Sequence, residues 1–101
     1  MGDTLYGSPA VINELKLLKR LLDVTCHQIK LLNREIDALN VRHIRAKRDN
    51  KKAFLYTLGL RRVSLDSILI LFLGFAQQKA DAIHKIEEEL REENRRVPSR
   101  N

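Results

Sequence analysis

The sequence has 101 residues, of which 44% are apolar and 32% are charged, with two prolines and no tryptophan. A chain of this length fits one small domain, and this composition is typical of long helices or coiled coils and argues against a sheet protein. The formal net charge of +6 is concentrated between Arg42 and Arg62, where eight basic residues are opposed only by Asp49.

The compartment follows from the cysteine content and from the first residues. Cys26 is the single cysteine and cannot form an internal disulfide, which favours a reducing compartment, cytoplasmic or nuclear. The first residues lack the basic start and the apolar run of a signal peptide. The apolar run around residues 68–76 is about half as long as a membrane-spanning helix requires. We therefore expect an intracellular protein without integral membrane insertion.

The first predicted helix begins at Ser8-Pro9, after a tail at residues 1–7 that is expected to be disordered. Ser8 can cap the free N–H groups, and proline suits the first helical position. Apolar residues then recur at heptad spacing, and neither proline nor glycine interrupts the chain between Pro9 and Gly59, so we predict a helix over about residues 9–56. Its a and d positions are Leu15, Leu18, Leu22, Thr25, Ile29, Leu32, Ile36, Leu39, His43 and Ala46.

The second predicted helix covers about residues 65–96, after a turn at about 57–64 in which Gly59 ends one helix and Ser64 caps the next. Pro98 ends this helix, and a tail follows at 98–101. The fold class is therefore all-α: an antiparallel, coiled-coil-like helical hairpin forming a single domain over residues 8–97.

A turn near Gly59 fixes the layers of the hairpin. It pairs Ile36 with Ile86, and it places His43 opposite Lys79 as a polar layer or as two side chains reaching for solvent. The same register brings Glu35 and Glu89 together, so the charges at the edge of the hairpin do not support it.

The hairpin leaves apolar surface uncovered. The helix from Leu65 to Ala80 is apolar almost all round, and one neighbour cannot cover it. In the predicted register residues 11–24 also overhang the second helix. We therefore expect a dimer or a higher oligomer, in which the two hairpins form a bundle. The candidate interface residues are Leu15, Leu18, Leu22, Ile29, Ile70, Leu71, Leu73 and Phe75.

No arrangement of residues points to catalysis. Cys26 and His27 are neighbours on a helix, and neighbours point about 100° apart, so they cannot act as nucleophile and base. The three histidines lack a metal-ligand spacing, and the acidic run at 87–93 is interpreted as a solvated helix face. We expect no enzyme activity, no metal site and no cofactor.

Two functions remain. The first is a non-enzymatic assembly or adaptor protein that associates with a second copy or with another helical protein. The alternative is a basic patch that binds nucleic acid or another polyanion, with acidic protein surfaces also possible partners. Attachment to a membrane surface through residues 65–75 is disfavoured, because that stretch has no hydrophilic face. The candidate polyanion contacts are Arg42, Arg45, Arg48, Lys51 and Lys52.

Overall fold

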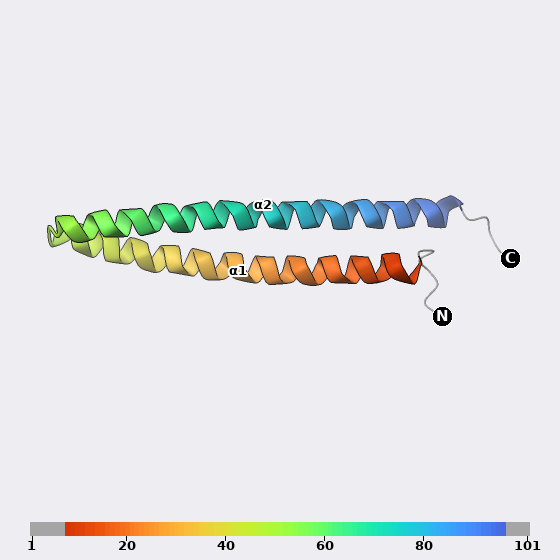
Figure 1. The fold of residues 1–101 in the computed structure, drawn as a ribbon, viewed down its shortest axis with the longest axis horizontal. Helices are drawn as coiled ribbons and strands as arrows, with labels where there is room; N and C mark the ends of the chain where they lie inside the picture. The colour runs from red at the N-terminus through yellow and green to blue at the C-terminus, as the bar shows by residue number, and fades with distance from the viewer. Residues whose placement is uncertain (1–7, 97–101) are drawn as a thin grey trace. The chain divides into compact units, whose positions relative to one another are not determined.

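The computed structural model describes residues 8–96 and contains two α-helices, α1 (Pro9–Arg48) and α2 (Lys52–Arg96). The chain divides into two compact units. We call residues 25–75 the turn unit, and residues 8–24 with 76–96 the terminal unit. Within each unit α1 and α2 lie side by side and antiparallel (Figure 1). The predicted all-α hairpin is confirmed, and the predicted tails at 1–7 and 98–101 lie outside the described residues.

The predicted start of the first helix is confirmed at Ser8. The Val11 amide donates to the Ser8 Oγ at 3.2 Å, and the Ile12 amide donates to the Ser8 carbonyl oxygen at 3.0 Å. The hydroxyl therefore satisfies one of the amides that the first helical turn leaves without a partner. Pro9 follows as the first helical residue, where its missing N–H costs nothing.

The predicted end of the first helix was wrong. The helix ends at Arg48 instead of near residue 56, and the chain turns at residues 49–51. Asn50 has a positive φ of 54°, the left-handed conformation in which asparagine is tolerated better than most residues. The Asn50 amide donates to the Lys47 carbonyl oxygen and the Lys51 amide to the Ala46 carbonyl oxygen, the two bonds of a Schellman cap. This cap stops α1 without a glycine.

Gly59 and Ser64 were predicted to form the turn, but both lie inside α2. Glycine costs roughly 1 kcal/mol relative to alanine in a helix interior, but burial of its neighbours Leu58 and Leu65 offsets that cost. The hydroxyl of Ser64 donates to the Leu60 carbonyl oxygen of its own helix, so it caps nothing. A helix-breaking residue did not break this helix, because apolar residues continue at heptad spacing through it.

The core of the turn unit joins residues from both helices. Its buried members are Ile36, Leu39, Ala46, Leu58 and Leu65, and Leu32, Leu55 and Leu69 pack against them. Ile36 thus shares its cluster with Leu65, which lies three heptads before its predicted partner Ile86. Nine of the ten predicted a and d positions of α1 are buried or half-buried, the exception being His43. Their pairing was wrong because the turn comes earlier in the chain.

The core of the terminal unit is built from the two ends of the chain. Leu15, Ile83 and Leu90 are buried in it, and Val11, Ile12, Leu18, Leu22 and Ile86 pack against them. The predicted overhang of residues 11–24 is therefore wrong, because the earlier turn makes α2 long enough to pack against the start of α1.

Charges at the edges agree with this register. Glu35 pairs with Arg61 at 3.2 Å in the turn unit, and Lys19 pairs with Glu87 at 3.1 Å in the terminal unit. Exposed pairs of this kind each contribute at most about 1 kcal/mol. These pairs favour the observed register over the predicted one, which placed Glu35 beside Glu89.

Candidate interaction surfaces

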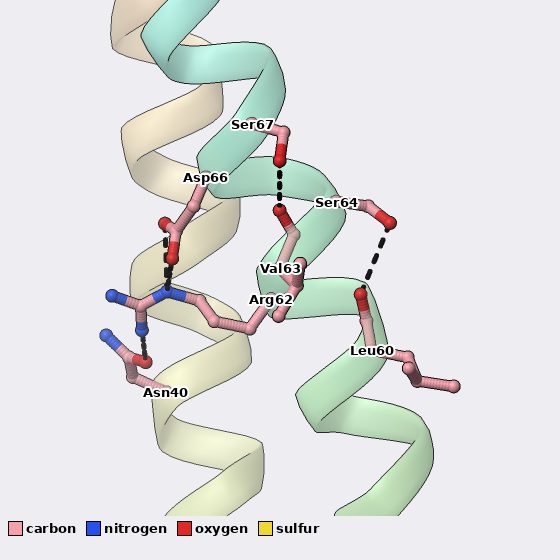
Figure 2. Close-up of polar contacts among 7 residues, drawn as sticks. All are labelled: Asn40, Leu60, Arg62, Val63, Ser64, Asp66 and Ser67. Atoms are coloured by element: carbon pink, nitrogen blue, oxygen red, sulfur yellow. Dashed lines mark hydrogen bonds and ion pairs between the residues drawn. The ribbon is translucent and has the colours of Figure 1, made fainter.

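A polar layer interrupts the apolar core of the turn unit at Arg62. The Arg62 Nε donates to both carboxylate oxygens of Asp66 at 3.1 Å, and Nη1 donates to Oδ1 of Asn40 on α1 (Figure 2). Arg62 lies at a heptad position that leucine or isoleucine usually fills. The charge of Arg62 is paired with Asp66, and its guanidinium also donates to Asn40 on α1. No buried nitrogen of this half-buried side chain is therefore left without a hydrogen-bond partner.

A small cavity lies beside this layer, lined by Leu39, Asn40, His43, Leu58, Gly59 and Arg62. His43 was expected either to form a polar layer with Lys79 or to reach for solvent; its side chain is exposed, and the polar layer is formed by Arg62 instead. The signal that could have identified Arg62 was its heptad position upstream of Leu69. The predicted turn at 57–64 excluded it from the helix and so hid it.

The outward surface of α2 in the turn unit carries large apolar side chains and small hydroxyl side chains but no charged one. We call it the outer face; its members are exposed and lie on the side of α2 opposite its core positions. They are Tyr56, Thr57, Leu60, Val63, Ser64, Ser67, Ile70, Leu71 and Gly74. The exposed fractions of the large ones are 71% for Tyr56, 54% for Leu60, 64% for Val63, 68% for Ile70 and 59% for Leu71.

The hydroxyl groups of the outer face are bonded within the helix itself. Ser64 donates to the Leu60 carbonyl oxygen at 3.2 Å, Ser67 to the Val63 oxygen at 2.9 Å, and Thr57 to the Ala53 oxygen at 3.3 Å. Figure 2 shows the two serine bonds running along α2. A hydroxyl that already donates to its own backbone can be covered by an apolar partner at little cost. The serines therefore act as small, nearly apolar positions.

The outer face ends where α2 leaves the turn unit. From Tyr56 to Gly74, all within the described helix, its positions carry no charged residue. The corresponding positions further along α2 are polar or charged: Gln77, Gln78, Asp81, His84, Lys85 and Glu88. The uncharged surface is thus a local feature of about 20 residues, or about 30 Å of helix, and not a property of the whole helix.

The eight predicted interface residues fall into two groups. Leu15 is buried, and Leu18, Leu22 and Ile29 are half-buried, all on the side of α1 that carries its core positions. Ile70, Leu71, Leu73 and Phe75 are exposed. Ile70 and Leu71 belong to the outer face, whereas Leu73 and Phe75 flank the core, where the rings of Phe75 and Phe72 lie 6.1 Å apart.

The predicted polyanion contacts lie together around the turn. Arg42, Arg45 and Arg48 are in the last two turns of α1, Lys51 is in the turn, and Lys52 begins α2. All five side chains are exposed. We call these residues, with Lys47, the basic turn. Asp49 is its only acidic residue and lies 3.8 Å from the Arg48 guanidinium.

Exposed apolar side chains flank the basic turn. Ile44 is 67% exposed, Phe54 46% and Tyr56 71%. The structure brings them to the same end of the turn unit, because the chain reverses at residues 49–51.

Within residues 8–96 no three histidine, cysteine or acidic side chains group as metal ligands. Neither described helix is both long and apolar enough to cross a membrane. Comparison with protein families, with curated proteins and with solved structures finds no match for this chain.

Proposed function

We propose that this hairpin is a non-enzymatic assembly protein, in which the outer face of α2 associates with the same face of a second copy. The observation that carries the proposal is the exposure of Leu60, Val63 and Ile70 on a surface without charged residues. Contiguous exposed apolar surface of this kind usually marks an interface.

The absence of charge favours a second copy as the partner. In a two-fold symmetric contact the same patch lies on both copies, so a charged residue near the axis would lie close to the identical residue of the other copy and be repelled by it. The outer face avoids this repulsion from Tyr56 to Gly74. It also has no charges by which it could select a differently charged partner.

Small residues suit the outer face to close helix contact. Ser64, Ser67 and Gly74 alternate with the large side chains, and a Cβ added at Gly74 would meet no atom within 4 Å. Small residues let two helices approach closely, and the large ones then fill the grooves beside them. Each large side chain that becomes fully buried contributes roughly 1.5–3 kcal/mol. This gain must exceed a cost of about 4–15 kcal/mol for the lost freedom of the two copies, so association at micromolar concentration requires most of the large side chains of both copies.

Sedimentation velocity on charge variants tests the proposal. Val63→Glu and Ile70→Glu should each shift the chain from the associated species to the monomer, because burying an unpaired carboxylate is costly. Gln78→Glu is the matched control, since it adds the same charge to an exposed position of α2 beyond the outer face. Association that survives both substitutions, or that Gln78→Glu weakens equally, would reject the outer face as the interface.

A further inference from the structure

A second surface of the hairpin has a different chemistry. We propose that the end of the turn unit docks on an anionic lipid surface. The cationic side chains of the basic turn would bind the headgroups, while Ile44, Phe54 and Tyr56 enter the boundary between headgroups and acyl chains. This inference uses other residues than the outer-face contact, apart from Tyr56 at its edge.

The charge of the basic turn is strong and accessible. Six basic residues lie within Arg42–Lys52 against one acidic residue, and each of the six side chains is exposed. The carboxylate of Asp49 lies near Arg48 and leaves the other five without an acidic neighbour inside the segment. Cationic clusters of this size are attracted to the negative potential of membranes that contain acidic lipids.

The flanking apolar side chains lie close enough to the turn to act with these charges. Ile44 is four residues before the end of α1, and Tyr56 is four residues after the start of α2. At 1.5 Å per residue, each is about 6 Å along its helix from the turn. Phe54 is nearer still. Shallow insertion of the turn therefore brings headgroup contacts and apolar contacts into the same layer.

An exposed isoleucine distinguishes a lipid surface from nucleic acid. Single-stranded nucleic acid is held by basic grooves in which aromatic rings stack on bases. Ile44 has no such use, yet it is 67% exposed, and Val41 one helical turn earlier is 50% exposed. Basic residues beside aliphatic and aromatic side chains are the composition of surfaces that lie in the membrane interface.

Vesicle cosedimentation of the full chain tests this proposal. The probes are vesicles of phosphatidylcholine alone and vesicles with about one third phosphatidylserine, at about 0.1 M salt. The chain should bind only the second kind. Neutralising Lys51 and Lys52 to glutamine should weaken binding by about 25-fold, at about fivefold per charge. The matched control, Lys16→Gln with Arg20→Gln, removes the same charge from exposed positions of the terminal unit and should change binding little.

A second pair of variants tests the apolar contribution. Ile44→Ser with Phe54→Ser keeps every charge and should weaken binding by about tenfold, because less apolar surface enters the interface. Circular dichroism should show the helices retained, and sedimentation velocity should show the association state unchanged, which separates this proposal from the preceding one. Equal losses in the control pair, no effect of the serine pair, or tighter binding to single-stranded DNA than to the acidic vesicles would each overturn it.

Discussion

The Lys51 amide donates to the Ala46 carbonyl oxygen at 2.9 Å, and this bond closes the turn on which the register of the hairpin depends. Between these two residues the chain reverses around Asn50, whose backbone is left-handed. Every core layer described above follows from reversal at this point.

Substitutions at Asn50 test the position of the turn. Asn50→Gly should raise the free energy of unfolding by about 0.5 kcal/mol, because glycine adopts a positive φ without strain. Asn50→Ala should lower it by about 1 kcal/mol. If residue 50 lay inside a continuous helix, both signs would reverse. Urea denaturation at one protomer concentration measures both variants.

Gly59 gives an independent test, because it lies inside α2 instead of ending a helix. Gly59→Ala should raise the free energy of unfolding by roughly 1 kcal/mol. The added Cβ meets no atom within 4 Å, so no clash offsets the gain. A glycine that capped a helix end in the left-handed conformation would give a loss on the same substitution, and thermal denaturation distinguishes the two.

The polar layer at Arg62 should contribute more to the pairing of the helices than to stability. Its side chain is 41% exposed, and its ion pair with Asp66 contributes at most about 1 kcal/mol. Arg62→Leu should therefore leave the free energy of unfolding unchanged or raise it by up to about 1 kcal/mol, whereas Arg62→Ala should lower it, because the packing of the side-chain stem is lost. A leucine variant less stable than the alanine variant would contradict this interpretation.

The pair between Glu35 and Arg61 provides a double-mutant cycle across the two helices. Glu35→Arg should lower the free energy of unfolding by about 0.5 kcal/mol at low salt, since like charges then meet. Adding Arg61→Glu should recover most of that loss, because the 3.2 Å pair is rebuilt in the opposite sense. Effects that simply add would mean that the two side chains are not neighbours.

The sequence predicted the helical class and the core positions well, because both follow from local periodicity. Ser8 was recognised from the chemistry of helix caps, and Ile36 and Leu39 were placed correctly on the core side, whereas Leu15 was expected to be exposed at an interface and is buried. A heptad pattern determines which face of a helix is buried. It does not determine which residues of two helices pair, because sliding one helix by seven residues keeps the same faces in contact. Only the turn resolves that ambiguity.

The turn was misjudged because glycine is the usual signal for it. Gly59 is tolerated inside α2, and Asn50 performs the left-handed cap that glycine usually provides. The edge charges held the missing information: Glu35 fitted poorly in the predicted register and finds Arg61 in the actual one. The same error hid the outer face, since its first residues were assigned to a loop.

The central claim is that the uncharged outer face of α2 joins two copies of the chain, and light scattering on the unmodified protein tests it most directly. At micromolar concentrations the measured mass should be a multiple of the 11.7 kDa chain and should fall toward 11.7 kDa on dilution. A mass of 11.7 kDa throughout that range would contradict the claim.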